Sequence, residues 1–133
     1  MNLENLPAPE PDGSLDGLWP SSARRVGGEI AIGGVGVSEL AAEYGTPLYV
    51  LDEDVLRARA RAWKEAMDEA FSRLRGADVY YAGKAFLCVA VAKAVAHEGL
   101  AVDACSEGEL RTALAAGVPG SRIGMHGNNK SRE

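Results

Sequence analysis

The sequence predicts an α/β protein with a parallel sheet, and three observations lead to this class. Short apolar runs start near residues 47, 79, 100 and 122, and a segment with helix signals follows each of the first three. The connections between runs have the lengths that crossovers between parallel strands require. No basic cluster or long apolar span points to another class. The spacing suits either a doubly wound sheet or part of a (β/α)₈ barrel.

The N-terminal segment differs from the rest in composition. Residues 1–28 are rich in proline, glycine, serine and acidic side chains, so we expect an extended lead-in without a core of its own. Residues 29–133 then form the α/β domain, starting with a short strand at 29–32. The glycine run at 33–36 matches neither GxGxxG nor a P-loop, and a plain turn is favoured over a phosphate cradle.

The next segment contains two predicted helices around one strand. Ser38 is expected to cap a short helix that ends at Tyr44, before a glycine and a proline. Residues 47–51 read as a buried strand. Asp52 is expected to cap a long amphipathic helix, whose apolar positions up to residue 74 recur at helical spacing.

Two further strand–helix pairs and a last strand follow. We predict strands at 79–82, 100–103 and 122–125, with a helix at 86–97. Ser106 and Glu109 have the Ser-x-x-Glu spacing of a capping box that opens the next helix. Glycines at 99 and 117 end the two helices.

Polar side chains follow three of these strands. Lys84 comes just after the first, Asp103 ends the second and His126 follows the third. Because parallel strands share one carboxyl edge, these side chains are expected at the same rim. A lysine in an apolar pocket is a usable nucleophile for carbonyl chemistry. Each residue also has a structural reading: a surface lysine, a turn cap and a loop histidine.

Composition narrows the function classes. Net charge is −5, which argues against nucleic acid or an anionic membrane as partner. Two cysteines in apolar context make no disulfide framework, and no signal peptide is visible, so a cytoplasmic location is expected. No metal site is predicted.

Four motifs carry a resemblance to one family. They are Tyr-Ala-Gly-Lys-Ala at 81–85, Asp-Ala-Cys-Ser-Glu-Gly-Glu-Leu at 103–110, His-Gly-Asn-Asn-Lys-Ser at 126–131 and Tyr-Gly-Thr-Pro-Leu-Tyr-Val-Leu-Asp-Glu at 44–53. In this order they resemble the diaminopimelate decarboxylase family, pyridoxal-phosphate enzymes of the alanine racemase and ornithine decarboxylase type. The Leu-Trp-Pro lead-in at 18–20 is similar too.

The resemblance implies the N-terminal portion of a (β/α)₈ barrel of the alanine racemase type, preceded by an extended segment that belongs to a β-domain. Lys84 matches the lysine that holds pyridoxal 5′-phosphate. Asp103 and Glu109 match acidic positions that orient this lysine, and His126 and Asn128 match the pocket-side loop. The implied reaction converts meso-2,6-diaminopimelate to L-lysine and carbon dioxide, in a homodimer that acts on a small amino acid.

The sequence departs from the family at two residues and in its length. Gly83 stands where the family more often has a small side chain, and Glu107 replaces a glycine. The resemblance covers only the first quarter to third of the family, so we expect an incomplete barrel that is inactive alone. Decarboxylation of ornithine or arginine, and a non-catalytic α/β piece, are the other readings.

Overall fold

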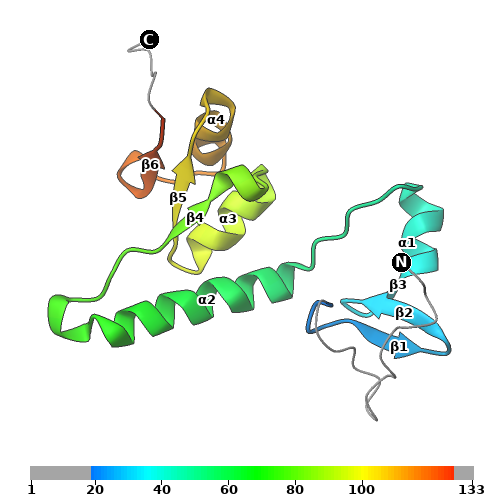
Figure 1. Cartoon of the computed structure of the whole chain (residues 1–133). Coiled ribbons are helices and arrows are strands. Elements are labelled where there is room, and N and C mark those ends of the chain that lie inside the picture. Colours follow the sequence, from blue (N-terminus) through cyan, green and yellow to red (C-terminus); the bar gives the residue numbers. More distant parts are fainter. Residues whose placement is uncertain (1–18, 128–133) are drawn as a thin grey trace. The chain divides into compact units, whose positions relative to one another are not determined.

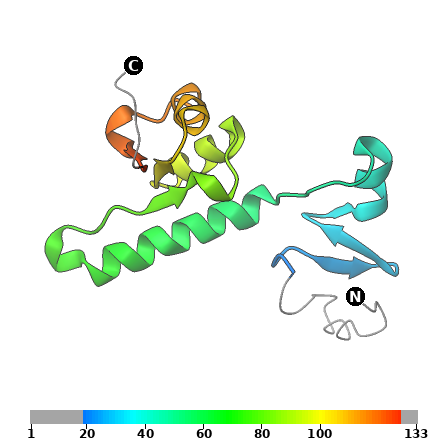
Figure 2. The same ribbon diagram turned by 45° about the horizontal axis from the view of Figure 1, so that its top comes forward.

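The computed structural model describes residues 19–127, which form two compact units (Figure 1). The first unit reaches Val55 and the second begins at Leu56. Each unit contains its own three-stranded sheet, seen from a second direction in Figure 2. None of the helices among residues 19–127 has the length and hydropathy needed to cross a membrane.

The first unit is an antiparallel meander. Strands β1 (Arg24–Val26), β2 (Glu29–Ile32) and β3 (Val35–Gly36) pair in the order β1-β2-β3. Two-glycine turns join them, and Gly33 and Gly34 have φ angles of 59° and 85°. Such angles are required in tight hairpin turns and are open to glycine. The strand predicted at 29–32 and the plain turn after it are therefore confirmed. Strand β1 lies within residues 1–28, the segment predicted to be an extended lead-in.

Helix α1 (Val37–Tyr44) follows β3 directly. The predicted Ser38 cap is wrong: Gly36 is the N-cap residue, and Ser38 lies inside the helix, where its N–H donates to Glu29 Oε1 at 2.6 Å. The strand continues into the helix and leaves no room for a separate cap. Hydrogen bonds from Ser38 lower the pKa of the Glu29 carboxyl below its ordinary value. The predicted end at Gly45, with φ of 80°, is confirmed.

The strand predicted at 47–51 is absent from the structure. These residues are extended chain without strand pairing, and Tyr49 is fully exposed while Leu48, Val50 and Leu51 are 40–56% exposed. An apolar run becomes a strand only where a neighbouring strand supplies hydrogen bonds. No strand among residues 19–127 pairs with it.

Helix α2 (Glu53–Ala70) begins as predicted. The Asp52 carboxylate accepts a hydrogen bond from the N–H of Val55 at 3.0 Å, and the Ser22 hydroxyl donates to its other oxygen. These bonds lower the pKa of Asp52, that of Ser22 most. A 3₁₀ turn, η2 (Ser72–Leu74), follows the helix.

The second unit is the predicted parallel α/β fold. Strands β4 (Tyr80–Ala82), β5 (Ala101–Ala104) and β6 (Ile123–Met125) lie side by side in that order, with α3 (Val89–His97) and α4 (Glu107–Ala115) as crossovers (Figure 1). A 3₁₀ turn, η4 (Gly120–Arg122), leads into β6. Both helices contact β5. The buried core comprises Ala60, Val91, Ala92, Val95, Leu100, Val102, Ala113 and Val118.

The segment between β4 and α3 differs from the prediction. The helix expected from residue 86 starts at Val89, and a single 3₁₀ turn, η3 (Gly83–Ala85), comes first. Phe86 and Cys88 are extended, with φ of −173° and −135°, so Cys88 is the N-cap residue. Its carbonyl accepts from Ala92 N–H at 2.9 Å. The helix ends as predicted at Gly99, whose φ is 84°.

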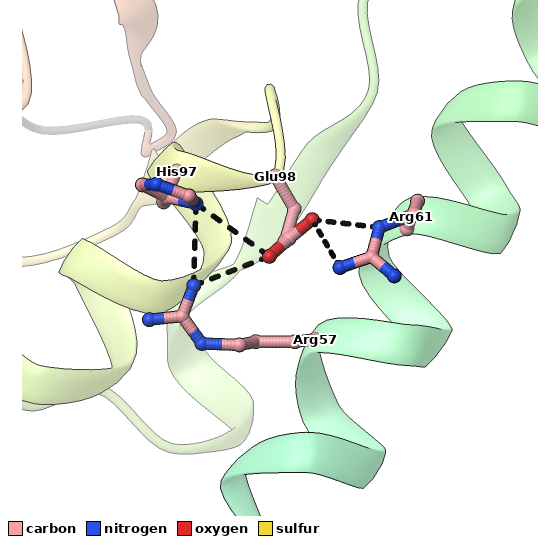
Figure 3. Close-up of polar contacts among 4 residues, drawn as sticks. All are labelled: Arg57, Arg61, His97 and Glu98. Carbon is pink, nitrogen blue, oxygen red and sulfur yellow. Dashed lines mark hydrogen bonds and ion pairs between the residues drawn. The ribbon is translucent and has the colours of Figure 1, made fainter.

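An ion cluster joins α2 to the end of α3 (Figure 3). Arg57 and Arg61 donate to the two carboxylate oxygens of Glu98 at 3.2 and 3.0 Å. The His97 ring lies 3.6 Å from the same carboxylate. Partial burial acts to raise the pKa of Glu98, whose side chain is 8% exposed, but these hydrogen bonds outweigh it and the pKa is lowered.

Candidate active site

The carboxyl ends of β4, β5 and β6 lie at one edge of the sheet. The register places Ala82 beside Asp103 and Asp103 beside Gly124, so these residues share one face. Lys84 lies two residues beyond β4, and His126 directly follows β6. In parallel α/β sheets this edge is where ligands bind.

Asp103 and His126 are in contact. The Nδ1 atom of His126 lies 2.8 Å from both carboxylate oxygens of Asp103. The backbone N–H of His126 donates to the carbonyl of Ala104 at 2.8 Å, which extends the β5–β6 ladder and places the ring beside Asp103. The structure thus brings together two of the residues expected at this rim, and it leaves 75% of the His126 side chain exposed.

Lys84 lies in the η3 turn with an exposed side chain. Within residues 19–127, no carboxylate forms an ion pair with its ammonium group, and Asp103 pairs with His126 instead. The charge of Lys84 acts on Cys105, at the carboxyl end of β5. An exposed amine at a strand end is accessible to an aldehyde.

Glu109 is bound to the loop that precedes α4. Its Oε2 atom accepts from the backbone N–H of Cys105 at 2.8 Å, and the Cys105 thiol lies 3.4 Å from both carboxylate oxygens. The hydrogen bond from the thiol to this carboxylate is the main reason why the pKa of the Cys105 thiol is raised. The Ser106 hydroxyl accepts from the N–H of Glu109 at 3.2 Å. The predicted cap is therefore confirmed, although the glutamate returns to Cys105 instead of Ser106.

Gly83 connects the lysine turn to these acidic residues. A Cβ atom at Gly83 would lie 2.9 Å from the carbonyl oxygen of Asp103 and 3.3 Å from Oε2 of Glu109. The turn that carries Lys84 therefore lies directly against the end of β5 and against Glu109. Lys84, Asp103 and Glu109 belong to one local cluster, even without direct bonds between their charged groups.

A hollow of about 410 Å³ lies on the sheet face beside the cluster. It is lined by Tyr80, Asp103, Gly124, Met125 and His126. The ring of Tyr80 reaches within 3.2 Å of where a Cβ of Gly124 would stand, so the absence of a side chain there makes room for the ring. Sequence reasoning missed Tyr80. Strand alternation is the signal that could have found it, because Tyr80 shares a face with Ala82, the neighbour of Asp103.

Glu107 and Asn128 are two further residues within the motifs of this site. The charge of Glu107, the unusual residue at the start of α4, is directed toward Arg111, which donates to it at 2.7 Å within the same helix. Much of its effect on the nearby site is therefore offset. Asn128, expected in the pocket-side loop, lies outside the described residues.

The donor set fits pyridoxal phosphate on its aldehyde side. An accessible amine can bond to an aldehyde, while carboxylates and an imidazole beside it can hold its charge and protons. The hollow next to Asp103 gives space on the same sheet face. Fold and cluster together define a parallel α/β domain that carries an exposed lysine and a carboxylate–imidazole pair at the carboxyl edge of its sheet.

Comparison with known proteins makes this class specific. Residues 53–133 match the family described as "Pyridoxal-dependent decarboxylase, pyridoxal binding domain". The chain therefore belongs to the pyridoxal-dependent decarboxylase family. It is 50% identical to diaminopimelate decarboxylase of Actinosynnema pretiosum over 117 residues, which cover 88% of this chain and 25% of the relative. For the Bacillus subtilis enzyme the identity is 49%, over 87% of this chain and 26% of the relative.

Solved structures agree with the sequence matches. A diaminopimelate decarboxylase from M. jannaschii superposes with a TM-score of 0.77 at 30% identity, over 84% of this chain and 26% of the other. The AQ1208 protein of Aquifex aeolicus gives a TM-score of 0.73 at 34% identity, over 83% of this chain and 26% of the other. The chain spans about a quarter of these relatives. The prediction of an incomplete N-terminal portion of the family's barrel is confirmed.

Proposed function

We propose that this chain is the lysine-bearing part of a decarboxylase that converts meso-2,6-diaminopimelate to L-lysine and carbon dioxide. The observation that carries the proposal is the 50% identity to a diaminopimelate decarboxylase over 88% of the chain. The position of Lys84 at the carboxyl end of β4 supports it, because this is the ligand-binding edge of such sheets.

In this proposal Lys84 holds pyridoxal phosphate through its side-chain nitrogen. When bound, the cofactor supplies a ring that accepts the electrons released as carbon dioxide leaves the substrate. The protein's own contribution is to present an amine that is not engaged by a carboxylate. The η3 turn does so, because it extends the Lys84 side chain into solvent beyond the strand.

We assign the acidic residues to orientation and charge. Glu109 is held by the backbone of Cys105 and touches the turn of Lys84 at Gly83, so it can orient this turn. Asp103 lies beside His126, which can donate a proton from Nδ1 and so hold the carboxylate in place. We assign His126 and Asn128, the residues that match the family's pocket-side loop, to cofactor binding.

The chain alone is proposed to be inactive. It spans a quarter of the relatives, and three parallel strands cannot enclose a site as a closed barrel does. We further propose that the whole protein acts as a homodimer in the cytoplasm. Carbon dioxide release from meso-2,6-diaminopimelate by the purified chain with cofactor would contradict the inactivity.

Reductive trapping tests the lysine assignment. The chain is incubated with pyridoxal phosphate, reduced with borohydride and mapped by peptide mass spectrometry. We expect the adduct at Lys84, its loss in Lys84→Ala, and no change in the matched variant Lys93→Ala, which alters an exposed lysine of α3. Labelling spread evenly over surface lysines, or none, would support a non-catalytic α/β piece instead.

A chimera tests whether the segment supports catalysis. Residues 18–127 replace the matching part of the B. subtilis relative, to which the chain is 49% identical. We expect decarboxylation of meso-2,6-diaminopimelate that depends on Lys84, measured against ornithine and arginine as alternative substrates. A chimera that folds and binds cofactor but prefers ornithine or arginine would favour the other basic amino-acid decarboxylases.

A further inference from the structure

The turn that carries Lys84 is bracketed by one side-chain hydrogen bond. The hydroxyl of Tyr81, in β4, donates to the backbone carbonyl of Phe86 at 2.7 Å. These two residues lie on either side of the η3 turn, so the bond closes a short loop around Lys84. It connects the strand before the lysine to the extended segment after it.

This loop is a short connection between β4 and α3. It is a single 3₁₀ turn followed by extended residues up to Cys88, and Lys84, Ala85 and Phe86 are all exposed. Short 3₁₀ turns have poorer hydrogen-bond geometry than α-helices. Gly83 is the buried residue of the turn. Leu87 and Cys88 pack against the core cluster, so Gly83 on one side and these two residues on the other hold the ends of the loop. Between them, the Tyr81 hydroxyl forms the side-chain hydrogen bond that restrains the backbone directly after the lysine.

Tyr81 itself is held by the core. Its half-buried ring packs against the buried cluster of the second unit, on the sheet face opposite to Ala82 and Asp103. Burial, with a smaller contribution from Cys88, raises the pKa of its phenol above an ordinary value that already keeps the hydroxyl protonated at neutral pH. The core therefore fixes the position of the Tyr81 hydroxyl, and the hydrogen bond from this hydroxyl fixes the position of the Phe86 carbonyl.

We propose that Tyr81 is a positioning residue for Lys84, whose hydroxyl holds the lysine turn in the conformation that presents the amine to the cofactor. The Tyr81 side chain acts through the backbone at Phe86 and does not touch the reacting atoms. The cofactor part of this inference rests on the function proposed above, whereas the restraint on the turn does not.

The test compares Tyr81→Phe with Tyr49→Phe in the full 133-residue chain. The first variant removes one hydroxyl and keeps the ring; the second removes a hydroxyl from a fully exposed tyrosine of the first unit. Thermal unfolding followed by circular dichroism fixes a temperature at which all three proteins are folded. At this temperature we measure amide hydrogen exchange without cofactor. We also measure the ratio of trapped pyridoxyl label at Lys84 to that at Lys93, over a range of pH.

We expect about three- to tenfold faster exchange at residues 84–88 in Tyr81→Phe, as for the loss of one hydrogen bond, with β5 unchanged. We also expect a similar fall in the Lys84 to Lys93 labelling ratio. Tyr49→Phe should match the parent in both. Unchanged exchange in Tyr81→Phe overturns the inference, and faster exchange with an unchanged ratio overturns the positioning role. If the parent is not labelled at Lys84, the proposed function fails. The hydrogen-exchange rates then still test whether the Tyr81 hydroxyl restrains the turn.

Discussion

At the residue scale, Glu109 has more partners than a simple cap needs. Its backbone N–H donates to Ser106, while its carboxylate accepts from the backbone N–H of Cys105 and contacts the thiol. The same carboxylate faces Gly83 in the lysine turn. One side chain therefore couples the start of α4, the end of β5 and the turn of Lys84.

This coupling predicts the reactivity of Cys105. The hydrogen bond to Glu109 raises the thiol pKa because a neighbouring carboxylate disfavours the thiolate. In Glu109→Gln the pKa should fall, and alkylation of Cys105 should reach its half-maximal rate at a lower pH. The rate of iodoacetamide modification against pH, followed at the Cys105 peptide, measures this.

Glu107→Gln is the matched control, because Glu107 is paired with Arg111 and not with the thiol. Its alkylation profile should stay close to that of the parent chain. A profile in Glu109→Gln that coincides with the parent would mean that the thiol–carboxylate contact is not formed in solution.

At the scale of the element, α4 depends on its N-cap. The Ser106 hydroxyl satisfies one of the N–H groups that a helix start leaves unpaired. Ser106→Ala should lower the free energy of unfolding by about 1 kcal/mol in urea titrations. Ser72→Ala, in an exposed 3₁₀ turn without a side-chain cap, should change it by a few tenths at most. Equal losses in the two variants would contradict the cap.

The link between α2 and α3 predicts a pH dependence. The pKa of Glu98 is lowered in the folded state. Its charge therefore contributes to stability above the pKa of a glutamate in the unfolded chain, about 4.3. That contribution is lost as pH falls through the lowered folded-state pKa. Glu98→Gln should therefore unfold at less urea than the parent near neutral pH, and the gap should close in acid.

Urea midpoints measured by circular dichroism between about pH 7 and pH 3 test this. Glu69→Gln, which alters an exposed acidic residue of α2, should follow the parent throughout. A gap that stays constant over this range would assign the effect of Glu98→Gln to packing instead of charge.

At the scale of the whole molecule, the segment 47–51 is an exposed apolar stretch within residues 19–127. It lies outside helices and strands, and its large apolar side chains are exposed. Such backbone is preferred by proteases. Brief chymotrypsin treatment should cut after Tyr49 or Leu51 before it cuts after Trp63, which is also exposed but lies within α2. A first cut at Trp63, read by mass spectrometry, would contradict the structure of this segment.

Prediction from sequence succeeded where local chemistry decides the structure. Asp52 and Ser106 cap helices, and Gly45 and Gly99 end them, because the capping bonds and the left-handed glycine conformation are set within a few residues. It failed at Ser38, where a preceding strand occupies the cap position, and at 47–51, where strand formation needs a distant partner. The helix after Lys84 starts three residues later than predicted because Phe86 and Cys88 are extended, and the hydrogen bond from the Tyr81 side chain holds Phe86.

The sequence by itself determined the α/β class and the place of Lys84, Asp103 and His126 at the strand ends, since apolar runs and their spacing encode these directly. It indicated the family through the resemblance of four motifs. Only the tertiary structure decided which of these three residues meet. Strand register places Asp103 against His126, and the missing side chain at Gly83 lets the lysine turn approach Glu109. Tyr80 and Tyr81 are adjacent in sequence but face opposite sides of the sheet. Because β4 pairs with β5, Tyr80 lines the hollow and Tyr81 packs against the core.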